Sequence, residues 1–169
     1  MKKQLLLLVT LISMISVFGQ KIDKDLIFGK WKAYSLITPK LAVNTDSLQS
    51  SKKAMENAAV ANSLSHTLGL KDSLKIAHDV IIIGKKIDSS YVQFNKNGTY
   101  VSYVCFAEGE NAEKTEGTFK WYSDSEISLS HESSTEIIRV KKLTSKLLSI
   151  AGNESKPDET FHVGFKRIE

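Results

Sequence analysis

The chain has 169 residues, of which 25% are charged and 41% are hydrophobic, and its formal net charge is +4. The basic residues are interspersed with acidic ones, which argues against the clustered basic face of a nucleic-acid-binding protein. Cys105 is the single cysteine, so an intramolecular disulfide is excluded and stability must come from packing.

The N-terminal segment has the pattern of a secretory signal peptide. Lys2 and Lys3 precede an apolar stretch over residues 5–17, and a glycine follows where a signal peptidase would cut. We therefore expect a signal peptide at residues 1–19, followed by a single domain at residues 20–169.

The same segment bears on where the protein is expected to work. Its apolar stretch is shorter than the ~20 residues of a membrane-spanning helix. No cysteine stands near the expected cleavage site, where a lipid would be attached. We expect an exported protein, periplasmic or extracellular, that is neither lipid-anchored nor membrane-spanning.

The first strand of the mature chain is expected over residues 30–37, where the apolar pattern is typical of a strand. An insertion with a helical period follows at about residues 39–89. Two helices placed there would suit a flap over one mouth of a barrel, or equally a plug that fills its lumen.

Helix signals divide the insertion in two. Asp46 is the expected N-cap of a first helix that runs to about residue 67. Asp72 is the expected cap of a second helix that ends at Gly84. The run at residues 80–83 is β-branched, so part of the second segment could instead be extended.

From residue 91 onward apolar and polar residues alternate between short turn signals, which is typical of an antiparallel sheet. Without a crossover helix the strands predict an up-and-down meander, and pairing of the first strand with the last would remove both unpaired edges. The sequence therefore predicts a mainly β fold with an eight-stranded antiparallel barrel. The seven later strands are expected at residues 91–94, 99–106, 117–122, 126–131, 136–142, 146–151 and 160–168.

The Asn97-Gly98 hairpin leaves two registers open. A two-residue turn pairs Phe94 with Val101 and points Cys105 into the barrel. A three-residue loop pairs Phe94 with Tyr100 and turns Cys105 outward. We favour the second register, because it places more large side chains on the same face of the sheet as Phe94.

Several short motifs resemble those of the bacterial lipocalin-like domains, which are exported barrels of the lipocalin/calycin type. They are Gly29-Lys30-Trp31, "YVQFNKNGTY", "EGTFKWYSDSEISLS" and "LTSKLLSI". The resemblance implies that Trp31 packs across the closed end of the barrel, with Arg167 laid over its indole ring. Gly29 would leave room for the turn into the strand.

Two hypotheses for function follow. The first is a non-enzymatic binding protein that holds a small hydrophobic or amphipathic ligand inside the barrel. The alternative is a protein-interaction or structural module with a filled core, whose partner binds the helical insertion and the loops. The volume of the lumen separates the two. By strand phase, the candidate ligand-binding residues are Tyr34, Phe94, Tyr100, Trp121, Leu129, His131 and Phe161.

Catalytic and metal-binding motifs are absent from the sequence. It contains neither a Gly-x-Ser-x-Gly turn nor a phosphate-binding loop. Its four histidines lack the spacing of metal ligands on one helix or strand. We therefore expect no enzymatic activity, no cofactor and no metal site. His131 is the histidine expected to face the lumen, since it is in phase with Ile127 and Leu129.

Overall fold

The computed structural model describes residues 22–39, 41–62, 70–105, 112–152 and 160–168. The predicted signal peptide at residues 1–19 lies outside this part of the chain.

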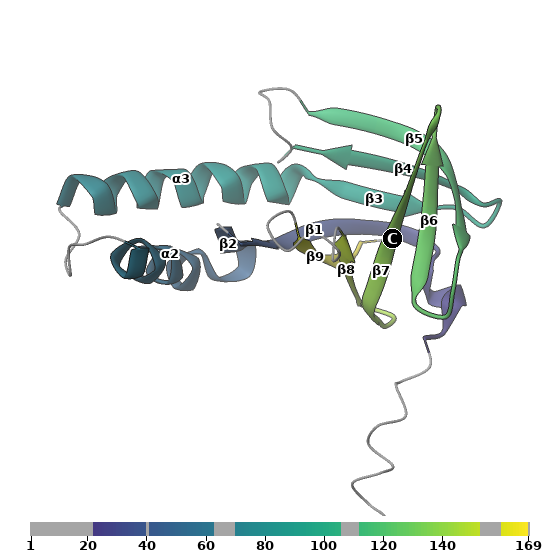
Figure 1. Ribbon diagram of the computed structural model, residues 1–169, viewed down its shortest axis with the longest axis horizontal. Helices are drawn as coiled ribbons and strands as arrows, with labels where there is room; N and C mark the ends of the chain where they lie inside the picture. The colour runs from purple at the N-terminus through teal and green to yellow at the C-terminus, as the bar shows by residue number, and fades with distance from the viewer. Residues whose placement is uncertain (1–21, 40, 63–69, 106–111, 153–159, 169) are drawn as a thin grey trace, which may run out of the picture.

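Eight antiparallel strands form a closed barrel (Figure 1). The first, β1, pairs with β9 on one edge and with β3 on the other, and each strand from β3 to β9 pairs with the next. Pairing of the first strand with the last confirms the predicted closure. The strands of the barrel are β1 (Gly29–Thr38), β3 (Tyr91–Phe94), β4 (Thr99–Val104), β5 (Glu113–Trp121), β6 (Glu126–His131), β7 (Ser134–Leu143), β8 (Leu147–Gly152) and β9 (Phe161–Arg167).

A ninth strand, β2 (Leu41–Asn44), lies at the start of the insertion, before the first expected helix, and was not predicted. Both β2 and β3 pair with the same edge of β1. The first four residues of β1 pair with β3, and its last four pair with β2. The long strand β1 thus continues past β3 as a hairpin with β2 that carries the rest of the insertion, while its other edge stays paired with β9 through Ile37.

The helical insertion consists of α2 (Leu48–Asn62) and α3 (Leu70–Ser89), which follow a short 3₁₀ turn, η2 (Thr45–Ser47). Asn44 caps this turn, because its side chain accepts a hydrogen bond from the Asp46 backbone N–H. Asp46, the predicted N-cap of the first helix, lies inside the turn, and the helix begins at Leu48. The chain continues as a helix through the β-branched run before Gly84 and through Gly84 itself. A Cβ at Gly84 would lie 2.9 Å from Leu48, so this glycine allows close helix packing instead of ending the helix.

The pair α2–α3, here called the helical arm, packs against β2 and extends away from the barrel (Figure 1). The arm is therefore neither the plug nor the flap that the sequence suggested. None of the described helices is both long enough and apolar enough to span a membrane.

One end of the barrel is closed by the 3₁₀ helix η1 (Lys24–Ile27) and the start of β1. The Trp31 side chain is fully buried, and its Nε1 donates a hydrogen bond to the Ile27 carbonyl oxygen over 2.7 Å. The Arg167 guanidinium carbon lies 4.2 Å from the centre of the indole ring, as the resemblance implied. Gly29 has a φ of 127°, a backbone conformation that favours glycine.

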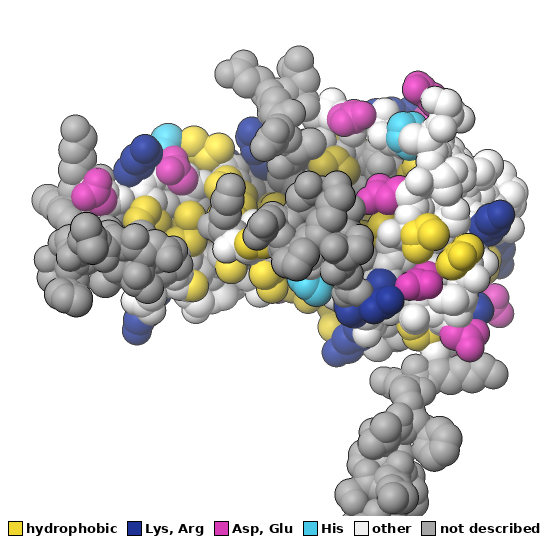
Figure 2. All heavy atoms as spheres, viewed as in Figure 1, with side chains coloured by type: hydrophobic (Ala, Val, Ile, Leu, Met, Phe, Trp, Pro, Cys, Tyr) yellow, Lys and Arg dark blue, Asp and Glu magenta, His cyan; other side chains and the backbone are white. Residues whose placement is uncertain are grey.

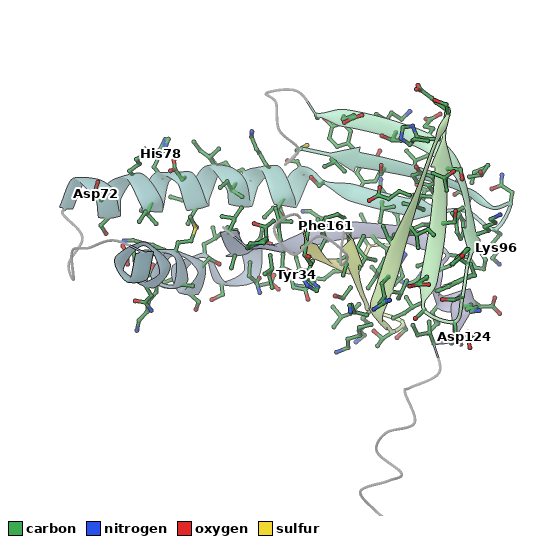
Figure 3. All side chains as sticks on the ribbon, in the orientation of Figure 1. Tyr34, Asp72, His78, Lys96, Asp124 and Phe161 are labelled. Atoms are coloured by element: carbon green, nitrogen blue, oxygen red, sulfur yellow. The ribbon has the colours of Figure 1, made fainter. Side chains whose placement is uncertain are left out.

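Arg167 also ties the closed end together through its donors. Its guanidinium donates to the carbonyl oxygens of Phe28 over 2.6 Å and of Ser145 over 2.8 Å, and to that of Leu26. Figure 3 shows Lys96 and Asp124, from two turns of the barrel, at the end opposite the helical arm, which carries Asp72 and His78. The arm and the closed end thus lie on opposite sides of the barrel.

Candidate ligand-binding cavity

The barrel encloses a cavity of about 460 Å³ toward the end from which the helical arm leaves, here called the open end. Its lining is mostly apolar. Ser90, which directly follows α3, is the residue nearest the arm in this lining, and no described residue of α2 or α3 takes part in it. The lining residues are Leu36, Thr38, Ser90, Tyr91, Val92, Phe94, Tyr100, Ser102, Tyr103, Val104, Leu129, Glu136, Ile138, Ile150, Phe161, Val163 and Phe165.

Strand register explains why the apolar residues meet in the lumen. Val163 of β9 lies opposite both Leu36 of β1 and Ile150 of β8. Residues directly opposite in an antiparallel pair point to the same face of the sheet. The inward positions of neighbouring strands therefore form one continuous apolar wall.

Two glycines make room for the aromatic residues of the lumen. The Tyr100 ring lies against Gly117, where an added Cβ would be 2.9 Å from it. The Phe161 ring lies against Gly152, where an added Cβ would be 2.3 Å from it. Because these two positions carry no side chain, each ring can lie close to the neighbouring strand.

Polar residues also stand in this lining, among them Tyr100 and Ser102 from β4 and Glu136 from β7. Burial raises the pKa of the Tyr100 phenol above its ordinary value, and the negative charge of Glu136 raises it further. The phenol therefore keeps its proton at neutral pH, and it can donate or accept a hydrogen bond.

Ser90 fixes the arm to the rim of the cavity. This serine is 1% exposed, and its hydroxyl donates to the Lys86 carbonyl oxygen and accepts from the Cys105 backbone N–H, each over 2.9 Å. Its own carbonyl oxygen accepts from the Ala33 N–H of β1. The end of α3 is thereby held to β1 and to the end of β4.

Four of the seven candidate ligand-binding residues line the cavity: Phe94, Tyr100, Leu129 and Phe161. The favoured hairpin register is confirmed, because Phe94 pairs with Tyr100. Whether these residues bind a ligand stays a prediction.

Tyr34 was predicted to face the lumen but lies on the outer surface. The pairing of β1 with β9 shifts between Ala33 and Ser35, so Tyr34 is left out of the ladder at a bulge. Its ring lies against Gly164, on the outward side of β9, and Lys166 Nζ is 5.0 Å from the ring centre. Alternation from the buried Trp31 and Ala33 already places Tyr34 on the outer face, and the bulge then brings Leu36, rather than Ser35, to the inward face.

Trp121 and His131 also lie outside the cavity lining. Trp121 is near the closed end, where Lys24 Nζ is 5.3 Å from its ring centre. His131 is at the β6–β7 turn, and its Nε2 is 3.0 Å from the Ser134 hydroxyl oxygen. Both residues are in the inward phase, but they lie at the two ends of the barrel.

The sequence analysis missed the polar residues Ser102 and Glu136 as candidate site residues. Glu136 lies opposite Leu129, and it shares the inward phase of Ile138. A charged residue in phase with the buried residues of its strand is the signal that would have identified it. Among the residues that the structure describes, no group of histidine, cysteine, aspartate or glutamate could hold a metal ion.

Among solved structures, the chain is similar to a crystal structure of a DUF4847 family protein from Bacteroides vulgatus. The two share 13% sequence identity with a TM-score of 0.46, and the match covers 83% of this chain and 93% of that one. No protein-family model matches the chain, and no curated protein does. Membership of the lipocalin-like domains stays a prediction.

Proposed function

We propose that the protein is an exported, non-enzymatic binding protein that holds a small hydrophobic or amphipathic molecule inside its barrel. The observation that carries this proposal is the mostly apolar cavity of about 460 Å³, with the helical arm outside it. An apolar, concave lining with a few polar groups is typical of small-molecule sites. Burial of an apolar ligand there contributes about 25 cal/mol per Å² of apolar surface removed from water.

Octanol is a suitable first probe, because it combines a flexible apolar chain with one small polar group. We expect saturable binding of one octanol molecule in a calorimetric titration. The variant Ser102→Phe places a ring in the lumen and is expected to weaken binding about tenfold or more. No binding by the wild-type protein would contradict the proposal.

Val101→Phe is the matched control, because Val101 is the neighbour of Ser102 on the opposite face of β4. It pairs with Gln93 and Glu116 and does not line the cavity. Octanol should bind this variant as it binds the wild type. Equal weakening in both variants would indicate that the added ring acts through stability rather than through the lumen.

Native mass spectrometry of protein purified from its own host addresses the natural ligand. We expect a population whose mass exceeds that of the chain by a small molecule, which is released on denaturation. An apo mass alone, together with no octanol binding, would favour the alternative function.

The alternative, a protein partner that binds the helical arm, stays a prediction. Leu74, Ile81 and Ile82 of α3 are exposed, at 62%, 48% and 41%. Figure 2 shows hydrophobic side chains gathered along this arm. The filled core that this alternative required is not what the structure has, because the lumen contains the cavity.

A further inference from the structure

We propose that the ligand of this cavity carries a cationic, hydrogen-bond-donating head, such as a primary ammonium group, which is bound by Glu136 while its apolar body fills the lumen. This inference rests on the proposed function and names the class of ligand. The bound molecule is therefore expected in one orientation, with its cationic head near Glu136 and Tyr100 and its apolar body deeper in the lumen.

Strand pairing places Glu136 on the inward face of β7. The residue lies opposite Leu129 in the pairing of β6 with β7, and two residues before the buried Ile138. All three line the cavity. The carboxylate is thus attached to the inward face of its strand, yet the residue is exposed, as expected at the mouth of a binding site.

Tyr100 contributes a second polar group to the same cavity. Tyr100 of β4 and Glu136 of β7 line the same cavity, and the charge of Glu136 contributes to the raised pKa of the Tyr100 phenol. The hydroxyl of Tyr100 and the carboxylate of Glu136 can both accept a hydrogen bond from an ammonium group, which has three donors to give. A carboxylate acceptor shortens and strengthens such a bond.

Within the described part of the chain, no lysine or arginine forms an ion pair with Glu136. Lysines on the outer face of the barrel are paired with other carboxylates, for example Lys32 with Asp88 and Lys114 with Glu116. Arg139, on the same strand as Glu136, donates to Glu126 over 3.0 Å. The carboxylate that lines the cavity is therefore available to a charge brought by the ligand.

The same charge disfavours anionic ligands. A fatty acid that placed its carboxylate beside Glu136 would meet a like charge. If it placed its carboxylate in the apolar lumen instead, it would lose the hydration of that charge without a partner. An alcohol meets neither penalty and gains no ion pair, so it serves as the neutral reference.

Three probes with the same apolar chain test the head group: octylamine, octanol and octanoate. At neutral pH we expect octylamine to bind about fivefold tighter than octanol, the upper end for a solvent-exposed ion pair. Octanoate should bind more weakly than octanol. Octylamine binding no tighter than octanol, or octanoate binding tightest, would overturn the inference.

Charge variants test whether Glu136 itself, rather than the overall charge of the protein, selects the head group of the ligand. Glu136→Gln should abolish the advantage of octylamine and leave octanol binding unchanged, and Glu136→Lys should make octanoate the preferred probe. Glu132→Gln is the matched control, because it removes the same charge from the β6–β7 turn without altering the cavity wall. Equal effects of Glu136→Gln and Glu132→Gln would overturn the inference.

The failures of the two proposals are distinguishable. If octanol binds but the head groups are not discriminated, the cavity is a ligand site and the cationic head is wrong. If none of the three probes binds the wild-type protein, the proposed function itself fails.

Discussion

The two ends of the barrel differ in how completely their side chains satisfy one another. At the closed end, Trp31 is fully buried and hydrogen-bonded, and Arg167 donates to three backbone carbonyls while lying over the indole ring. At the open end, aromatic rings lie against glycines, and Glu136 and Tyr100 face a cavity. The closed end is therefore densely bonded, whereas the open end contains a cavity.

Replacement of Trp31 by alanine should have the largest effect on stability. Loss of a large buried aromatic side chain costs about 3–5 kcal/mol. We expect this decrease in the free energy of unfolding, measured by urea denaturation. A decrease below about 1 kcal/mol would mean that the closed end does not carry the stability assigned to it.

Arg167→Met should have the next largest effect on stability. The variant keeps an apolar side chain of similar length but loses the donors to Leu26, Phe28 and Ser145. We expect the free energy of unfolding to fall by about 2–3 kcal/mol. Arg167→Lys should recover only part of this, because an ammonium group cannot reproduce the planar fork. Full recovery by lysine would show that only the charge matters.

The two glycines of the open end sharpen the comparison. Gly117→Ala should lower the free energy of unfolding by about 1–3 kcal/mol, because the added Cβ would lie 2.2 Å from the Ser130 carbonyl oxygen. For Gly152→Ala the three atoms nearest to the added Cβ all belong to the Phe161 ring, which can move into the cavity, so we expect less than about 1 kcal/mol.

The contact between Gly152 and Phe161 should also affect ligand binding. Because the displaced Phe161 ring would occupy part of the lumen, Gly152→Ala should weaken octanol binding in calorimetric titration. A Gly152→Ala variant that binds octanol like the wild type would show that Phe161 does not border the occupied space.

The smallest effect concerns alkaline pH. The pKa of Tyr100 is raised by burial and by Glu136, so the folded protein holds this proton more tightly than the unfolded chain does. Its contribution to stability is therefore complete below the ordinary pKa of 10.0 and is lost as the pH rises through the folded-state value. Between these values, Tyr100→Phe should lose stability less steeply with pH than the wild type in urea unfolding. Parallel curves would contradict this linkage.

Much of the fold could be predicted from alternation and turn signals. Strands β3 and β6 begin and end at the predicted residues, and closure through β1 and β9 was expected. Strand β2 was missed, because four residues inside a segment with a helical period give too little alternation to detect. Gly84 was misread as a helix stop, because the sequence does not show that α2 packs against it.

The candidate site was harder to predict, since period-two alternation gives the face of a strand but not the height along the barrel. Trp121 is in phase but lies at the closed end, and His131 is in phase but turns to Ser134. Tyr34 faces outward because it alternates with the buried Trp31 and Ala33, whereas the bulge brings Leu36 to the inward face. Glu136 was overlooked, although the phase of its strand was available.

The central claim is that the open end of the lumen, and not the surface of the arm, is the ligand site. Methyl NMR of the protein during an octanol titration tests it most directly. The account predicts saturable shifts of the cavity methyl groups of Ile138, Ile150 and Val163, with little change at Ile27 of the closed end. Shifts confined to Leu74 and Ile81 of α3 would contradict it.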